Sequence, residues 1–372
     1  MNILILNFIL STPVDGKIIR RDTNRDTMIY NMARGFVKNG HTVTLLCADE
    51  FRPLREETND FEVVYFKSRL SRLFKPWLLP FPAGLARYLR RHKDEVDMVL
   101  TVETFSVPTL IASAVCRDKL MIWQEMSYHQ RLMRNLPSKI WHNIVMPLSI
   151  RGVLTVPQSE AARRFISGYQ PAVSAMCVPH GVNDDIFRPD PDGSSEKCFV
   201  VISMLVRRKR VDRIIEKFAR FVENSGQTDY RLLIVGDGDE APALKHLAES
   251  SGVGANVEFL GFRSHDEIAA IGRHATALLV DTDRDLNMVS VSEALANGTP
   301  VLMNTVPNTS AYVTEMGLGI AKDGWDWMDL NEMIARYDEF HGNCVACRNS
   351  FTNTGCAGRL VKIFESRGAV KG

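Results

Sequence analysis

The sequence predicts an α/β protein built from two Rossmann-like domains, each with a doubly wound parallel sheet, that face a central cleft. Three observations support this prediction. At 372 residues the chain is longer than one hydrophobic core usually supports. Short apolar runs rich in branched residues alternate with helical patterns, and this alternation occurs twice along the chain.

The first half carries six apolar runs that are too short for helices and that we expect to be buried parallel strands. These runs are residues 3–8, 42–47, 63–66, 98–102, 120–123 and 153–156. Helical patterns lie between them, including residues 27–38, which end at the cap signal Asn39-Gly40, and residues 161–167, which end at Gly168.

The second half repeats this order. We expect strands at residues 199–205, 232–235, 257–260, 277–280 and 301–303, separated by helices of about ten residues. A stretch rich in proline, glycine and aspartate near Pro179 and Gly181 interrupts both patterns and predicts the hinge. We therefore place the domains at residues 1–177 and 178–350, with a last segment at 351–372.

Composition excludes several classes of function. The formal net charge is only +1, so no general excess of positive charge would attract nucleic acid. The chain has no run of 18 apolar residues, and its start lacks the features of a secretory signal. Its seven cysteines are an odd number that favours a reducing compartment over a disulfide framework. We expect a cytoplasmic protein.

A basic turn is the first candidate site, because sites in this fold lie at the carboxyl ends of strands. Arg207, Arg208, Lys209 and Arg210 follow an expected strand and precede an amphipathic helix. The N–H groups and dipole of a helix N-terminus favour an anion, and these cations would suit a diphosphate. The alternative is a solvated basic turn.

A second candidate begins at Asp285 and continues through Val289 and Ser290 to Glu293, at the start of another expected helix. Its two carboxylates could reach hydroxyl groups of a ligand whose phosphate meets the helix N-terminus. Ser290 and Glu293 also match a capping box, which would occupy Glu293 with a backbone N–H. Asp281, Asp283 and Asp285 resemble the paired aspartates that hold a metal in some sugar transferases, although such a short run arises easily by chance.

The third candidate is Gly236, Asp237 and Gly238, which follow an expected strand and lie about twenty residues before Glu258. The spacing matches a dinucleotide fingerprint, so a nicotinamide-dependent dehydrogenase is an alternative function. However, the acidic residues of this loop would repel a pyrophosphate. A tight glycine turn that lets a ligand approach the backbone fits better. The C-x2-C pair at Cys344 and Cys347 lacks a second pair, so we expect no zinc.

Together these residues resemble family 4 glycosyltransferases with the GT-B fold. The resemblance covers about residues 178–305 in order and spacing. Its parts are VPHGVNDDIF at 178–187, Lys209, LIVGDG at 233–238, VEFLG at 257–261 and Asp285 to Glu293 continuing as EALANGTPV to Val301. The N-terminal half agrees more loosely, through a first strand and a loop that contains Gly16, and the resemblance places acceptor recognition there.

The resemblance implies retaining transfer from a nucleoside diphosphate sugar, with no cofactor and no catalytic metal. Lys209 would hold the donor phosphates, Asp285 would contact the transferred sugar, and Glu293 would bind the ribose hydroxyls. The loop at 236–238 and Phe262 would border the nucleotide.

Three residues depart from the family pattern. Met204 stands where an arginine is usual, Arg210 where glycine is usual, and Asp285 where glutamate is usual. Arg207 or Arg208 would compensate for the missing arginine. An inactive sugar-binding relative is a further alternative, against which the retention of Lys209, Asp285 and Glu293 argues.

Polar residues at the expected strand ends of the first domain are candidates to orient the acceptor hydroxyl. They are Glu103, Gln124, Glu125 and His129, of which the last two follow the strand that ends at Trp123. The acceptor would be a saccharide or a lipid-linked saccharide. The resemblance also suggests that the last helix crosses back to the first domain.

One stretch of the first domain suggests contact with an anionic membrane. It begins at Lys67, ends at Lys93 and contains eight basic residues and no acidic one. Apolar residues lie among the charges, so the stretch could supply both cations and apolar anchors. The alternative is that the apolar residues pack inside the domain beneath a solvated basic surface.

Overall fold

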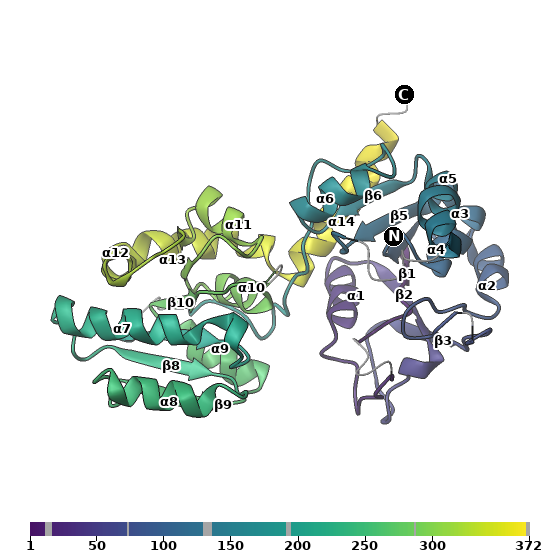
Figure 1. Cartoon of the computed structure of the whole chain (residues 1–372). Coiled ribbons are helices and arrows are strands. Elements are labelled where there is room, and N and C mark those ends of the chain that lie inside the picture. The colour runs from purple at the N-terminus through teal and green to yellow at the C-terminus, as the bar shows by residue number, and fades with distance from the viewer. Residues whose placement is uncertain (12–16, 73, 129–135, 191–194, 286–287, 370–372) are drawn as a thin grey trace. The chain divides into compact units, whose positions relative to one another are not determined.

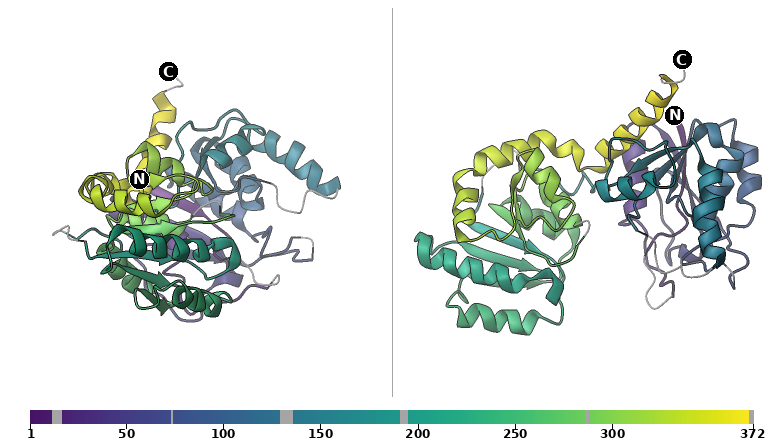
Figure 2. Two further views of the ribbon diagram at one scale, coloured as in Figure 1. Left: turned by 60° about the vertical axis from the view of Figure 1, so that its left-hand side comes forward. Right: turned by 45° about the horizontal axis from the view of Figure 1, so that its top comes forward.

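The computed structural model describes residues 1–11, 17–72, 74–128, 136–190, 195–285 and 288–369. The chain forms two compact units, one of Met1–Gly181 with Asn353–Gly372 and the other of Val182–Thr352 (Figure 1). Each unit contains a six-stranded sheet whose described strand pairs are all parallel, with helices on both faces (Figure 2). The predicted α/β class, with two domains that each contain a doubly wound parallel sheet, is therefore confirmed.

The sheet of unit 1 has the strand order β3-β2-β1-β4-β5-β6. The order reverses between β1 and β4, which is where a doubly wound fold presents its carboxyl ends to a ligand. The strands are β1 Asn2–Leu6, β2 Thr42–Ala48, β3 Glu62–Phe66, β4 Met98–Val102, β5 Leu120–Gln124 and β6 Leu154–Pro157. The helices are α1 Met28–Lys38, α2 Leu85–His92, α3 Val107–Val115, α4 Leu136–Ile140, α5 Met146–Ile150 and α6 Glu160–Ser167.

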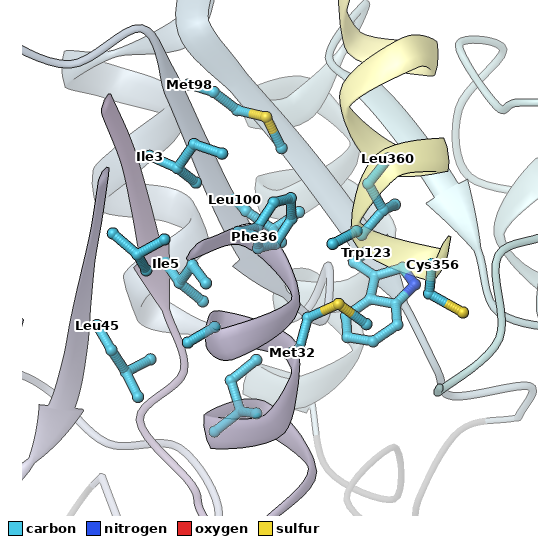
Figure 3. Packing of buried hydrophobic residues seen from close by; sticks show 14 of the residues in the cluster. Ile3, Ile5, Met32, Phe36, Leu45, Met98, Leu100, Trp123, Cys356 and Leu360 are labelled. Carbon is cyan, nitrogen blue, oxygen red and sulfur yellow. The ribbon is translucent and has the colours of Figure 1, made fainter. Parts of the chain in front are cut away.

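The last helix, α14 (Asn353–Ala369), belongs to unit 1 and packs against α1. Cys356 and Leu360 of this helix share a buried core with Phe36 and Trp123 (Figure 3). The two helices meet closely at Gly35, where a Cβ atom would lie 2.5 Å from the Asn353 carbonyl oxygen. Glycine at this position therefore lets α14 complete the core on this face of the sheet.

The sheet of unit 2 has the order β12-β11-β10-β7-β8-β9. Its strands are β7 Cys198–Ile202, β8 Arg231–Val235, β9 Val257–Gly261, β10 Ala277–Val280, β11 Val301–Met303 and β12 Gly319–Ala321. Its helices are α7 Val211–Ser225, α8 Ala241–Ser250, α9 His265–Arg273, α10 Val289–Ala296, α11 Ser310–Glu315, α12 Trp327–Ala335 and α13 Tyr337–Cys347.

Short helical turns join several of these elements. The 3-10 turns are η1 Asp49–Phe51, η2 Arg117–Lys119, η5 Arg207–Lys209 and η6 Arg348–Ser350, and a π-helical turn, η4 Trp141–Val145, connects α4 to α5. Among the described residues, no helix is both long enough and apolar enough to cross a membrane.

Strand β7 ends three residues earlier than the sequence predicts. The Ser203 N–H still donates to the Val235 carbonyl oxygen of β8, but the Leu205 N–H donates to the Asp237 carbonyl oxygen of the following loop at 2.9 Å. Residues 203–205 therefore follow that loop and not a strand. This turn carries the chain from β7 into the basic turn η5. It therefore positions the cations of the candidate site.

Candidate functional site

The basic turn lies between β7 and α7, as the sequence predicts. Arg207, Arg208 and Lys209 form η5, and Arg210 precedes the first residue of α7. Arg210 has φ 42° and ψ 39°, in the left-handed region that favours glycine. Its backbone conformation gives a physical reason for the glycine that the family pattern has at this position.

The basic turn meets Asp285. The Lys209 ammonium group contacts the Asp285 carboxylate, and Arg208 Nη1 lies 3.1 Å from the same oxygen. The side chains of Lys209 and Asp285 are only 11% and 17% exposed, so water screens this pair less than a surface ion pair. The Arg208 carbonyl oxygen also accepts hydrogen bonds from the Thr282 hydroxyl and the Asp283 N–H, each at 2.9 Å.

Asp281 and Asp283 contact basic side chains of the adjacent helix. Lys217 Nζ lies 2.6 Å from Asp281, and Arg213 reaches Asp283 at 3.0 Å. Arg210 adds a 3.2 Å contact to Asp283. Ammonium and guanidinium groups thus stand beside both carboxylates of the pair that resembles a metal-binding motif.

Glu293 lies within α10 and is 7% exposed. Burial raises the pKa of its carboxyl group, and His265, whose Nε2 is 3.7 Å from Glu293 Oε1, acts in the opposite direction. The helix begins at Val289, and its N-cap residue Met288 makes no side-chain cap bond. The capping-box alternative is therefore not formed, since both Ser290 and Glu293 lie inside the helix. Val289 is exposed and Ser290 half-buried at the first turn.

The glycine loop after β8 packs tightly against the chain itself. Gly236 has φ 130°, and a Cβ atom there would lie 1.8 Å from the Ser203 carbonyl oxygen. A Cβ atom on Gly238 would lie 2.3 Å from the Leu205 carbonyl oxygen. Both glycines thus allow two backbone segments to approach each other.

Other predicted nucleotide-site residues are accessible near this loop. The Gly236 N–H donates to the Gly261 carbonyl oxygen at 2.9 Å, which places the end of β9 beside the loop. Asp237 Oδ1 accepts a bond from the Gly238 N–H at 2.8 Å. Phe262 is 84% exposed, and Met204 and Arg207 are exposed as well. Phe262 therefore leaves an aromatic face open to a ligand.

In unit 1, Glu103 joins the ends of two neighbouring strands. It follows β4 with φ 72°, a left-handed conformation for a residue with a side chain. Its carboxylate accepts hydrogen bonds from the N–H groups of Glu125 and Met126, at 3.0 and 2.8 Å, and from the Gln124 amide at 2.8 Å. Burial raises the pKa of Glu103 to about 8, against the lowering effect of these donors.

His180, which the sequence analysis did not single out, is the partner of Glu125. Its Nε2 lies 3.4 Å from Glu125 Oε1. Its ring packs edge-on against the buried Trp123, with 4.9 Å between the ring centroids. Burial acts to raise the pKa of Glu125, but the hydrogen bond and charge of His180 outweigh it and the net shift is downward. The motif Val178-Pro179-His180-Gly181 was visible in the sequence, but nothing in it indicated Glu125 as a partner.

Two predicted residues, Gly16 and His129, lie outside the described residues. Of the others, the structure brings Arg208, Lys209 and Asp285 together in unit 2. It likewise brings Glu103, Gln124 and Glu125 together in unit 1.

Comparison with known families matches both halves of the chain. The family described as "Glycosyl transferases group 1" matches residues 183–339. The family described as "Glycosyltransferase Family 4" matches residues 26–186. The two matches fall on successive parts of the sequence and together reach from α1 to α13.

Relatives with assigned activities match a part of the chain. A GDP-mannose-dependent alpha-(1-6)-phosphatidylinositol monomannoside mannosyltransferase of Mycobacterium tuberculosis is 30% identical over 194 residues, covering 46% of this chain and 49% of its own length. A D-inositol 3-phosphate glycosyltransferase of Corynebacterium urealyticum is 28% identical over 186 residues, covering 46% and 43%. The matches thus span about half the length of these relatives.

Solved structures share the fold over nearly the whole chain. A glycosyltransferase from Rickettsia africae superposes with a TM-score of 0.64 at 13% identity, covering 98% of both chains. The Anabaena protein HepE, solved in complex with UDP and glucose, gives 0.60 at 16% identity, covering 98% of this chain and 100% of HepE. At such identities the likeness concerns the fold.

Proposed function

Because the chain belongs to the family 4 glycosyltransferases and has the GT-B fold, we propose that it transfers a sugar from a nucleoside diphosphate sugar with retention and without a metal. The acceptor is a saccharide or a lipid-linked saccharide used in a surface polysaccharide or glycolipid. No cofactor takes part. The HepE complexes hold UDP and UDP-glucose, and the mycobacterial relative is named as GDP-mannose-dependent, so both nucleotides are candidates.

The observation that carries this proposal is the contact of Arg208 and Lys209 with Asp285. Transfer from a nucleotide sugar needs cations for the departing diphosphate and acceptors for the sugar hydroxyls, in direct proximity. Here the cations of Arg208 and Lys209 contact the Asp285 carboxylate within unit 2. In the proposed complex, Lys209 holds the phosphates and Asp285 accepts a bond from a hydroxyl of the transferred sugar.

Glu293 supplies the third contact with the donor. Its buried carboxyl accepts hydrogen bonds from the ribose hydroxyls, which would offset the cost of burying a carboxylate among apolar neighbours. The exposed ring of Phe262 and the glycine loop border the nucleotide. All of these residues belong to unit 2.

In the proposed reaction, the bond between the anomeric carbon and the phosphate oxygen breaks. The acceptor hydroxyl oxygen bonds to the anomeric carbon on the same face, and its proton passes to the departing phosphate. Negative charge grows on that phosphate during the step, so Lys209 and Arg208 stabilise the transition state more than the bound donor. Arg208 binds the departing phosphate in place of the arginine that the family usually has at the position of Met204.

Unit 1 orients the acceptor. Glu125 is half-exposed and fixed by His180, so it can accept a bond from an acceptor hydroxyl in a defined direction. Glu103 holds the backbone of Glu125 and Met126 and acts through them as a positioning residue.

The stretch between Lys67 and Lys93 is the proposed membrane-facing surface of this cytoplasmic enzyme. All eight of its basic side chains are exposed. They are Lys67, Arg69, Arg72, Lys75, Arg87, Arg90, Arg91 and Lys93. Electrostatic attraction to anionic lipid would bring the enzyme to a lipid-linked acceptor.

Donor binding tests the proposal directly. Isothermal calorimetry with GDP, UDP and their hexose conjugates is expected to show binding to the wild-type chain and weaker binding to Lys209→Ala. Turnover with the binding donor and a lipid-linked acceptor would then establish transfer, and the anomeric configuration of the product would establish retention. A chain that binds none of these donors would contradict the proposal, and one that binds but never transfers would be an inactive relative.

A further inference from the structure

A stripe of exposed aliphatic side chains runs along one helical segment of unit 1. The segment consists of α4, the π-helical turn η4 and α5. Leu136, Ile140, Ile144 and Leu148 are 70%, 42%, 52% and 65% exposed, and we call them the outer stripe. Because they are four residues apart, they follow one another along the same side of the helix.

The opposite side of this segment is firmly packed. Met146 and Ile150 are completely buried in the core of unit 1, and they lie half a helical turn from Ile144 and Leu148. Trp141 donates to the Phe105 carbonyl oxygen at 3.4 Å. Arg117 donates to the carbonyl oxygens of Ser149 and Arg151 at 2.6 and 2.5 Å, which closes the C-terminal end. The outer stripe is therefore presented by an anchored helix.

The π-helical turn has a cause in the sequence. Pro147 has no N–H to donate to the carbonyl oxygen of Asn143 four residues earlier, so the hydrogen-bond ladder is interrupted there. Around this turn the helix is apolar on two sides, because Met146 and Ile150 face the core while Ile144 and Leu148 face outward. Such a helix normally has a neighbour on both sides, and here one side faces solvent.

The charged residues of the helical segment itself are all basic. No aspartate or glutamate occurs between Glu125 and Glu160. Lys139 and Arg151 of this stretch are exposed. Helix α3 packs against both α5 and α2, and α2 carries the exposed Arg87, Arg90 and Arg91 (Figure 1). The arrangement therefore combines an apolar strip with cations on its own helix and on a helix nearby.

By contrast, most of the described apolar residues between Lys67 and Lys93 make poor anchors, and Leu70, which is 57% exposed, is the exception. Phe74, Trp77, Leu78, Leu79 and Phe81 are half-buried, and the rings of Phe74 and Phe81 are 5.3 Å apart. The rest of the unit therefore shields much of their surface. The basic stretch thus supplies charge and one exposed aliphatic side chain, whereas the outer stripe supplies four.

We infer that the outer stripe inserts into an anionic lipid surface, with α4 and α5 lying in the plane of the interface. The four aliphatic side chains enter the acyl region, while Lys139, Arg151 and the α2 arginines meet the headgroup phosphates. The choice of lipid over a protein partner rests on the charge pattern, because a helical segment that carries cations and no acidic residue matches anionic headgroups. The inference deepens the proposed function, since it assigns the anchor by which the enzyme would reach a lipid-linked acceptor.

Vesicle sedimentation tests the inference, using phosphatidylcholine with and without phosphatidylglycerol. The wild-type chain is expected to pellet only with the anionic vesicles. Ile144→Ser combined with Leu148→Ser should lower the bound fraction at least about tenfold, because two large apolar side chains no longer enter the lipid. The matched control, Met328→Ser combined with Val345→Ser, alters two exposed apolar residues of unit 2 and should bind as the wild type does.

A second readout reports insertion itself. Tryptophan fluorescence of Ile144→Trp should shift to shorter wavelength with anionic vesicles and stay unchanged with neutral ones. Equal pelleting of the serine pair and the wild type, or no fluorescence shift, would overturn the inference. So would a chain that ignores vesicles but forms a dimer that the serine pair dissociates. Calorimetry with GDP and UDP on the same variants separates the two proposals, because donor binding fails only if the proposed function is wrong.

Discussion

The Lys209 ammonium group contacts the Asp285 carboxylate at the carboxyl edge of the unit 2 sheet, and both side chains are mostly shielded from water. The contact places opposite charges side by side where water screens them only weakly. A donor diphosphate would therefore meet a cation that is already positioned. The same contact would hold Asp285 in place for a hydroxyl of the proposed donor sugar.

Removing either donor-facing charge should weaken nucleotide binding. Lys209→Ala and Glu293→Ala are each expected to reduce the affinity for GDP or UDP by roughly tenfold to a hundredfold, as one charged hydrogen bond contributes about 1.5–3 kcal/mol. Isothermal calorimetry measures the change. Lys245→Ala and Glu223→Ala, at exposed positions on α8 and α7, are the matched controls and should leave affinity unchanged.

The Glu293 variant also separates a binding role from a structural one. Because Glu293 makes no cap bond, its loss should not cost the roughly 1 kcal/mol that a lost cap would. Intact affinity together with reduced stability would show that Glu293 serves the helix and not the donor.

The strands of both sheets could be predicted from the sequence because buried parallel strands are short, continuous apolar runs. Strand β12 was missed, since its three residues, Gly319–Ala321, begin with glycine and are too few to form a pattern. The end of β7 was misplaced because Leu205 is apolar and buried, yet it pairs with the glycine loop and not with a strand. The sequence pattern does not distinguish a buried apolar residue in a strand from one that pairs with a loop.

The proximity of the residues proposed for the donor could be predicted more completely than that of the residues proposed for the acceptor. Lys209 and Asp285 both follow expected strands, and the carboxyl ends of parallel strands share one edge of a sheet. His180 was missed because its contact with Glu125 depends on how the segment after β6 returns across the sheet toward Trp123. The spacing of residue types along the sequence does not predict which distant side chains such a segment will contact.

Arg210 offers a test of backbone strain. A left-handed conformation costs a residue with a side chain about 1–2 kcal/mol, and its partly exposed ion pairs with Asp212 and Asp283 contribute at most about 1 kcal/mol each. Arg210→Gly should therefore change the free energy of unfolding by less than about 1 kcal/mol. Arg210→Val should lower the free energy of unfolding by more than about 2 kcal/mol, because the ion pairs are lost and a branched side chain increases the backbone strain.

Urea denaturation compares these variants, with Arg207→Val as a control at an exposed position that is not left-handed. If Arg210→Gly proved as unstable as Arg210→Val, the ion pairs and not the backbone would set the stability of this turn.

Transfer is expected to survive chelation of divalent metals. Asp281 lies 2.6 Å from Lys217, and Asp283 contacts both Arg210 and Arg213, so cationic side chains already stand beside these carboxylates. The diphosphate would be neutralised by Lys209 and Arg208, which removes the need for a metal. Turnover in excess EDTA should equal that in its absence. Loss of turnover that manganese or magnesium restores would contradict this expectation.

The stability of unit 1 should fall as pH rises through the neutral range because of Glu103. Its pKa in the folded chain is raised to about 8 by burial, above its ordinary value of 4.5. Between these values the folded state holds a proton that the unfolded state has released, so the free energy of unfolding decreases as pH increases. The usual carboxylate, whose folded pKa is lowered, gives the opposite slope.

Glu103→Gln removes this titration while keeping an oxygen that can accept from the N–H groups of Glu125 and Met126. The decrease in unfolding free energy between pH 5 and pH 8 should then be smaller by roughly 1–3 kcal/mol than in the wild type. Urea denaturation across that range measures the slope, and Glu56→Gln, at an exposed position of the same unit, should retain the wild-type slope. Because the wild type and Glu103→Gln share all other titrating groups, an unchanged slope in Glu103→Gln would mean that the Glu103 carboxyl titrates near its ordinary pKa in the folded protein.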